Sequence, residues 1–191
     1  MASSPMESSR PSARQAGIWR NTFRAPRMMS TSCQTKSMSA MSNSRPPLFS
    51  VLIALGSNLG DRGWYLRRAI HELRDAVSVV RISRVIETEP VDAPRGSPRF
   101  LNMVVAGYTH LSPERLLDAL QSIESRLGRR RGARNAPRVI DLDLILHSAH
   151  VMRSATLTLP HPRYLRRDFV VKPLGELRLP WRDPLTGHSL R

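Results

Sequence analysis

The sequence predicts an α+β fold: a ferredoxin-like βαββαβ sandwich with an antiparallel sheet, helices packed on it, and a short C-terminal extension. Three observations lead to this prediction. Apolar segments of strand and helix type follow one another in the order β-α-β-β-α-β between residues 48 and 146. Each helical segment follows a turn or cap signal. The length of 191 residues suits one domain with a tail. We therefore expect a domain at 48–191, preceded by an extension at 1–47.

The first strand and helix are expected on either side of a glycine-rich turn. Residues 48–55 (LFSVLIAL) form a short apolar run typical of a buried strand. The turn GSNLGD (56–61) ends this strand, and apolar residues then recur at helical spacing over about 62–76. The turn is not a phosphate-binding P-loop, because neither GKS nor GKT follows it. The side chains available to cap the helix are those of Ser57, Asn58 and Asp61.

The middle of the chain predicts two strands and a second helix. Residues 79–89 (VVRISRVIETE) alternate as one strand, and 100–109 (FLNMVVAGYT) form the next. The segment 90–98 between them is too rich in Pro and Gly for a helix or strand and is predicted to be a loop. Ser112 followed by Pro113 is typical of a helix start, and the apolar stripe of this helix lasts to Gly128.

The strand predicted at 140–146 (IDLDLIL) carries two aspartates one residue apart. Alternate residues of a strand share a face, so Asp141 and Asp143 should project together with Cα atoms roughly 6.5–7 Å apart. Leu142 and Leu144 should then face a core. Two carboxylates side by side repel each other, so the pair favours a hard divalent cation. Mg²⁺ fits, because it is commonly held by one or two carboxylates plus water and phosphate oxygens.

Six arginines lie just upstream of this strand, within ESRLGRRRGARNAPR (124–138). Arginine offers fixed charge and forked donors that suit a polyphosphate. An isolated Asp-x-Asp is weak evidence for a metal, and an isolated arginine run is usually a solvated face or a nucleic-acid patch. Their occurrence together within about twenty residues points to phosphoryl or pyrophosphoryl transfer.

Composition sets the broad class of the protein. The net charge is +15 and the pI about 11.6, which favours nucleic acid as a partner, but only two of the 30 basic residues are lysines. Such a bias toward arginine can reflect coding composition as much as function, so the charge is weaker evidence for a nucleic-acid partner. The one cysteine, Cys33, excludes an internal disulfide and favours a reducing compartment. No apolar run approaches the length of about 18 residues that a membrane helix needs, so we expect a soluble, cytoplasmic protein that does not bind membranes.

Residues 1–47 differ from the rest of the chain. They are rich in Ser and Arg, contain Glu7 as their one acid and show no sustained apolar period. Such a segment buries too little apolar surface to offset its ordering entropy, so we expect it to be disordered or dispensable. Internal methionines offer other start sites. One alternative is an organelle transit peptide, since such peptides have the same composition, and another is a binding tail.

Five stretches resemble the 6-hydroxymethyl-7,8-dihydropterin pyrophosphokinase family, and they cover about residue 50 to the C-terminus. The family pattern PR-x-x-D-x-D is here Pro137 to Asp143. This resemblance implies transfer of the β,γ-diphosphate of ATP to the hydroxymethyl group of the pterin, leaving AMP, in folate biosynthesis. The stretches are ALGSNLGDR (54–62), ETEPV (87–91), FLNMVV (100–105), APRVIDLDLIL (136–146) and LTLPHPRYLRRDFVVKPLGEL (157–177).

The resemblance also implies roles for individual residues. Two Mg²⁺ ions would be held by Asp141 and Asp143. The phosphates would be clamped, and the reaction assisted, by Arg129, Arg131, Arg134 and Arg138. ATP would be contacted by Gln121, Glu124, Arg131, Arg138, Thr158, His161 and Arg167. The pterin would lie between Phe100 and Phe169 and be read by Asn102 and the backbone near Thr88 and Val91.

The main alternative is a basic RNA-binding domain, because RNA-recognition modules share this strand order. Such modules stack bases on aromatic residues of their central strands, whereas aromatic residues make up only 5% of this chain. Two acids on one face would also repel RNA phosphates. We therefore expect small-molecule substrates, no nucleic-acid partner and a monomer.

Overall fold

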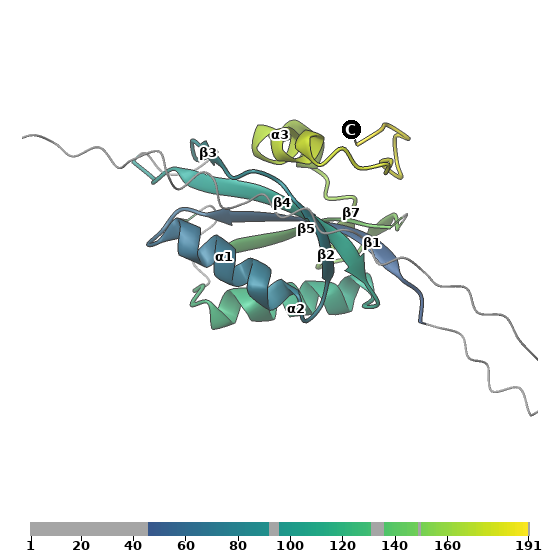
Figure 1. The fold of residues 1–191 in the computed structure, drawn as a ribbon, viewed down its shortest axis with the longest axis horizontal. Coiled ribbons are helices and arrows are strands. Elements are labelled where there is room, and N and C mark those ends of the chain that lie inside the picture. The colour runs from purple at the N-terminus through teal and green to yellow at the C-terminus, as the bar shows by residue number, and fades with distance from the viewer. Residues whose placement is uncertain (1–45, 92–95, 131–135, 149, 191) are drawn as a thin grey trace, which may run out of the picture. The chain divides into compact units, whose positions relative to one another are not determined.

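The computed structural model describes residues 46–91, 96–130, 136–148 and 150–190, which fold around one antiparallel sheet (Figure 1). These residues belong to the unit Ala40–Arg191, and nearly all of the predicted extension at 1–47 lies outside them. The strands of the sheet are β1 (Phe49–Ser57), β2 (Ser78–Ile82), β3 (Ile86–Thr88), β4 (Phe100–Thr109) and β5 (Asp141–His147). Their order is β2-β4-β1-β5, with β3 also paired to β4.

The helices cover both faces of the sheet. Helices α1 (Arg62–Leu73) and α2 (Pro113–Arg126) lie on one face, and α3 (Asp168–Glu176) lies on the other (Figure 1). The two faces carry separate apolar clusters, one around Ile53 and one around Leu52. Because β1 is central and covered on both sides, its sequence is a continuous apolar run rather than an alternating one. The predicted α+β class and antiparallel sheet are confirmed.

The prediction of one strand over 79–89 was wrong, because Ser83 interrupts it. Ser83 is buried, and its hydroxyl accepts the backbone N–H of Val104 at 2.9 Å and donates to the carbonyl of Arg84 at 2.8 Å. A side chain thus replaces part of the backbone ladder. The segment therefore forms two short strands, β2 and β3, on the same edge of β4.

Local capping explains where the two long helices begin. Asp61, rather than Ser57 or Asn58, caps α1, because its carboxylate accepts the N–H of Trp64 at 2.9 Å. Ser112 caps α2 by accepting the N–H of Arg115, and Pro113 occupies the first turn as predicted. Helix α1 ends at Leu73, three residues earlier than expected.

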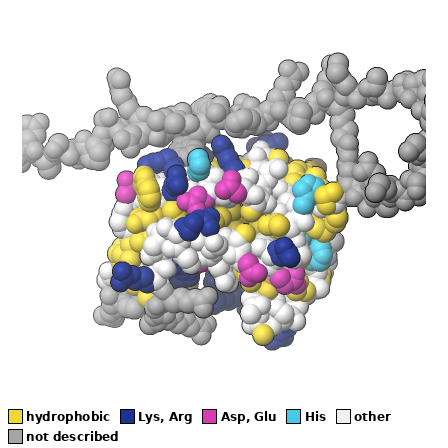
Figure 2. Space-filling view, turned by 90° about the horizontal axis from the view of Figure 1, so that it is seen from below, with side chains coloured by type: hydrophobic (Ala, Val, Ile, Leu, Met, Phe, Trp, Pro, Cys, Tyr) yellow, Lys and Arg dark blue, Asp and Glu magenta, His cyan; other side chains and the backbone are white. Residues whose placement is uncertain are grey.

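The chain after β5 forms short elements that return to the sheet. They are β6 (Met152–Arg153), β7 (Thr158–Leu159), the 3-10 turn η2 (Tyr164–Arg166) and α3. No helix in the described part of the chain is long and apolar enough to cross a membrane. The face shown in Figure 2 carries acidic side chains among its basic ones, rather than a continuous basic surface.

Candidate active site

A pocket of about 650 Å³ lies where β1, β4 and β5 meet the segments 136–138 and 161–169. It contains most of the residues that the sequence had suggested. Those that line it are Thr88, Val91, Phe100, Asn102, Arg129, Arg138, Asp141, Asp143, His161, Arg167 and Phe169. Arg131 and Arg134 lie outside the described residues.

The two aspartates project from the same face of β5, as predicted. They alternate with Leu142 and Leu144, which are buried in the cluster beneath α1 and α2. The side chains of Asp141 and Asp143 are 25% and 37% exposed, so both carboxylates remain open to a ligand. Because side chains alternate along a strand, the leucines of β5 face the core and its two aspartates face the pocket.

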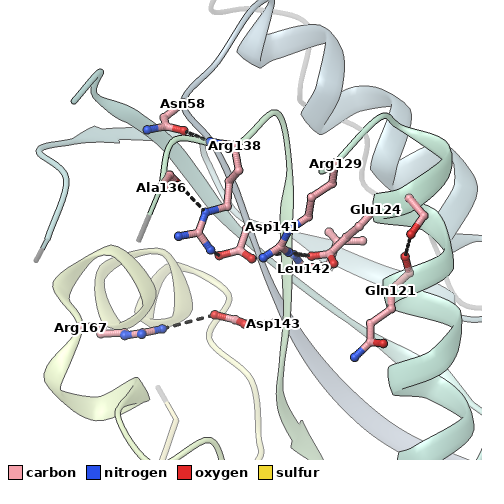
Figure 3. A network of polar contacts seen from close by, with 11 residues as sticks. Asn58, Gln121, Glu124, Arg129, Ala136, Arg138, Asp141, Leu142, Asp143 and Arg167 are labelled. Atoms are coloured by element: carbon pink, nitrogen blue, oxygen red, sulfur yellow. Dashed lines mark hydrogen bonds and ion pairs between the residues drawn. The ribbon is translucent and has the colours of Figure 1, made fainter. Parts of the chain in front are cut away.

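Each aspartate contacts at least one arginine (Figure 3). Asp141 lies between two of them: one oxygen is 2.6 Å from Nη1 of Arg129, and the other is 3.1 Å from Nη1 of Arg138. Asp143 is 3.3 Å from Nη1 of Arg167. Carboxylates and guanidinium groups therefore lie side by side in the pocket, an arrangement that suits both a cation and an anion.

The electrostatics of Asp143 favour a positive partner. Burial raises its pKa above the ordinary value, and the neighbouring Asp141 raises it further, while Arg167, Arg129 and Arg138 act in the opposite direction. The upward shift means that Asp143 carries its charge at a cost. A cation placed between the two carboxylates would relieve that cost.

Glu124 lies behind the aspartates and does not line the pocket. Its carboxylate accepts the backbone N–H of Leu142 at 2.6 Å and pairs with Arg129 (Figure 3). Burial raises the pKa of Glu124, opposed by the bond from Leu142 and the charge of Arg129. Gly128, with φ +86°, lets the chain turn back after α2 so that Arg129 reaches this position. Glu124, which the sequence analysis assigned to ATP, therefore supports the strand that carries Asp141 and Asp143 and does not face the pocket in this structure.

Asn58 supports the pocket from behind Arg138, a role that the sequence analysis did not assign. It is 2% exposed, and its side-chain oxygen accepts the N–H of Arg138 at 2.7 Å, while its own N–H donates to the Arg138 carbonyl at 3.1 Å. Ser57 donates to the carbonyl of Val139 at 2.6 Å. The turn GSNLGD thus anchors the chain that leads into β5. In the sequence, the polar residues of this turn directly follow an apolar strand, and that contrast could have indicated a role for Asn58.

Near Phe100, three small or polar residues lie side by side on neighbouring strands of the pocket. Asp141, Gly56 and Asn102 lie opposite one another on β5, β1 and β4. The Asn102 amide donates to the hydroxyl of Thr88 at 2.8 Å, which orients it. A Cβ at Gly56 would lie 2.9 Å from the Asn102 side-chain oxygen and 3.6 Å from the ring of Phe100. Glycine is therefore required for this close approach.

The segment 158–169 contributes a histidine and several arginines. The pKa of His161 is lowered to about 4 by burial and by the charges of Arg167 and Arg163, so the imidazole is neutral near pH 7. The guanidinium carbon of Arg167 lies 5.3 Å from the centre of the Phe169 ring. Arg163 and Arg166 also line the pocket, although the sequence analysis had not selected them.

Besides Glu124, two predicted ATP contacts are not among the residues that line the pocket. Gln121 is exposed on α2, and Thr158 pairs with Arg153 in the small β6-β7 sheet. Their assignment to ATP stays a prediction.

Two neighbouring carboxylates fit a magnesium ion, which is commonly held by one or two carboxylates together with water and phosphate oxygens. Among the described residues there is no cluster of three or more His, Cys, Asp or Glu side chains suited to a metal. The protein thus offers two carboxylates, and the remaining ligands would be water and phosphate oxygens, as Mg²⁺ prefers.

Comparison with known proteins identifies relatives of this chain. The family model described as 7,8-dihydro-6-hydroxymethylpterin-pyrophosphokinase (HPPK) matches residues 52–179. The 2-amino-4-hydroxy-6-hydroxymethyldihydropteridine pyrophosphokinase of Bacillus subtilis is 45% identical over 127 residues, covering 65% of this chain and 75% of that protein. The Porphyromonas gingivalis protein of the same name is 41% identical over 139 residues, covering 70% and 93%.

Longer proteins match over part of their length. A folate synthesis bifunctional protein of Arabidopsis thaliana is 43% identical over 129 residues, which is 66% of this chain and 26% of that protein. The crystal structure of wild-type Plasmodium falciparum HPPK-DHPS with SDX-DHP superposes with a TM-score of 0.60 at 12% identity. That match covers 78% of this chain and 44% of the Plasmodium chain, and at this identity it supports the fold alone.

Proposed function

The chain belongs to the 7,8-dihydro-6-hydroxymethylpterin-pyrophosphokinase family, the ATP-dependent pyrophosphokinases of folate biosynthesis, and we propose how its residues perform that reaction. The substrates are ATP and 6-hydroxymethyl-7,8-dihydropterin. The hydroxymethyl oxygen bonds to the β-phosphorus, and the bond from that phosphorus to the bridging α,β-oxygen breaks. AMP leaves, and the β- and γ-phosphates stay together on the pterin.

One observation carries this assignment. A pair of neighbouring carboxylates, three arginines and two phenylalanines converge on one pocket although they come from distant parts of the chain. Phosphoryl-type transfer depends chiefly on positioning and on charge stabilisation, so these groups match its needs. The family relationship favours this function over the RNA-binding alternative.

We assign the metal role to Asp141 and Asp143. Bound Mg²⁺ would neutralise phosphate charge and acidify the attacking hydroxyl. The two carboxylates hold their positions because β5 alternates and because Glu124 fixes the backbone N–H between them. The raised pKa of Asp143, which burial and then Asp141 cause, is consistent with a site arranged for a cation.

We assign the phosphate role to Arg129, Arg138 and Arg167. Each contacts an aspartate in this structure and can turn toward phosphate oxygens when those carboxylates take a cation. Arg131 and Arg134, which lie outside the described residues, would complete the proposed clamp. His161, neutral because burial and nearby arginines lower its pKa, would donate a hydrogen bond to the nucleotide without adding charge.

We assign pterin binding to Phe100 and Phe169, with Asn102 and Thr88 beside them. A flat heteroaromatic ring stacks well against phenyl rings. The Asn102 amide, oriented by Thr88, suits the donor and acceptor edge of the pterin. Val91 is 61% exposed at the pocket rim, where its backbone would contribute to the same edge.

The test is to incubate the protein with ATP, Mg²⁺ and 6-hydroxymethyl-7,8-dihydropterin and to separate the nucleotides. We expect AMP and a diphosphorylated pterin. ADP, or no product from a protein that circular dichroism shows to be folded, would reject the proposal. Arg167→Gln should raise KM for ATP. The matched control, Arg68→Gln, removes an arginine that pairs with Glu72 on α1 and should leave KM unchanged.

A further inference from the structure

The C-terminal turn, residues 181–190, is organised around Asp183. This segment follows the part of the chain that the family model matches. Asp183 is 2% exposed, and its Oδ1 accepts the backbone N–H groups of Leu185 at 2.8 Å and Thr186 at 2.7 Å. Its own N–H donates to the carbonyl of His188 at 2.9 Å. The carboxylate is therefore held rigidly within the turn.

The other oxygen of Asp183 accepts the hydroxyl of Tyr164. Tyr164 is 3% exposed on η2, so this bond is shielded from water. Burial acts to raise the pKa of Asp183, but the hydrogen bonds from Tyr164, Thr186 and Leu185 outweigh it, and the net shift is downward. Asp183 is thus a charged acceptor, and hydrogen bonds to charged groups are stronger than neutral ones.

The C-terminal turn is also attached to the main sheet. The ring of Trp181 lies 6.1 Å from that of Tyr108 on β4, in an edge-to-face arrangement. Leu190 is buried in the same apolar cluster as Leu52 of β1, and its N–H closes the turn on the carbonyl of Trp181 at 3.0 Å. Asp183 consequently has a fixed position relative to the strands that form the pocket.

Tyr164 connects this anchor to the pocket-lining segment. Its backbone N–H donates to the carbonyl of His161 at 3.1 Å, and its carbonyl accepts the N–H of Arg167 at 3.2 Å. His161 and Arg167 both line the pocket. A rotation or shift of η2 would therefore move an imidazole and a guanidinium together, including the contact from Arg167 to Asp143.

We propose that Tyr164 and Asp183 form a positioning pair that holds His161 and Arg167 where they can bind ATP. Neither residue touches the substrate in this assignment. The inference rests on the proposed nucleotide role of the segment 161–167. It extends that role by making the C-terminal turn part of the nucleotide site.

The test compares Tyr164→Phe, which removes only the hydroxyl, with Thr109→Val. Thr109 is 2% exposed at the opposite end of β4. Its hydroxyl donates to the carbonyl of Ala76 at 2.7 Å and accepts the N–H of Leu111 at 3.1 Å, so the control also removes a buried hydroxyl and at least as many hydrogen bonds. Tyr164→Phe should raise KM for ATP, and Kd for a nonhydrolysable ATP analogue by calorimetry, about threefold to tenfold. KM for the pterin should not change. Thr109→Val should alter neither constant.

A second variant separates a specific pair from a general loss of packing. If the hydroxyl acts through Asp183, adding Tyr164→Phe to Asp183→Ala should cause no further change in the ATP analogue Kd. Unchanged nucleotide binding in Tyr164→Phe, or an equal change in Thr109→Val, would overturn the inference. Failure of wild type to produce AMP would instead reject the proposed function, because analogue binding is measured independently of turnover.

Discussion

The carboxylate of Glu124 accepts the backbone N–H of Leu142 at 2.6 Å, so a residue of α2 holds the peptide that lies between the two pocket aspartates. Leu142 itself points into the core, and Glu124 is 7% exposed. The bond joins helix and strand directly behind Asp141 and Asp143. Changes at Glu124 should therefore be visible in both stability and activity.

Replacing Glu124 by alanine should lower the free energy of unfolding by about 1–3 kcal/mol, because the N–H of Leu142 would lose its buried partner. Turnover should fall as well, since β5 and Arg129 would both be less well held. Glu124→Gln retains an acceptor and should lose less stability. Urea unfolding with an AMP assay measures both effects. Equal stability of wild type and Glu124→Ala would contradict the structural role.

Replacing Asp143 by alanine should leave a folded protein with turnover reduced by about 100-fold or more, because a proposed metal ligand is lost. Its side chain is 37% exposed, so its removal should leave the fold intact. The measurement is AMP formation over a range of Mg²⁺ concentrations. Asp168→Ala, which removes an exposed carboxylate paired with Lys172 on α3, is the control. Normal turnover in Asp143→Ala would remove the metal role.

Replacing Gly56 by alanine should raise KM for the pterin, because the new methyl group would push against the Asn102 side-chain oxygen 2.9 Å away. KM for ATP should change less, since the atoms nearest to the new methyl group belong to the proposed pterin residues Asn102 and Phe100. Gly175→Ala is a matched control: nothing lies within 4 Å of its Cβ, and alanine favours the helix by roughly 0.5–1 kcal/mol. Steady-state kinetics with each substrate varied in turn provides the comparison. Equal effects on both constants would point to a general distortion.

The lowered pKa of His161 predicts a pH effect on stability. The folded-state value is about 4, below the unfolded value near 6.5, so the unfolded chain binds the proton first as pH falls. Wild type should therefore lose stability between pH 6.5 and 4 relative to His161→Gln. Denaturant unfolding at several pH values measures the difference. A difference that stayed constant over this range would show that His161 is not held neutral.

The sequence by itself determined most strands of the sheet and its two long helices. Strand and helix periods depend on neighbouring residues, so the strand 100–109 and the start of α2 at Pro113 were predicted correctly. The alternation around Asp141 and Asp143 also predicted that both would share a face opposite the core, which the burial of Leu142 confirms.

The tertiary structure decided what depends on contacts between distant residues. The side-chain bond of Ser83 to Val104 splits a segment that alternates like one strand, and the bonds of Asn58 to Arg138 and of Tyr164 to Asp183 have no local pattern. Helical position alone also could not show that Glu124 faces the back of β5 rather than the pocket. The physical reason is that periodicity records only which side of an element is buried. The partner that a polar side chain meets depends on how the elements pack.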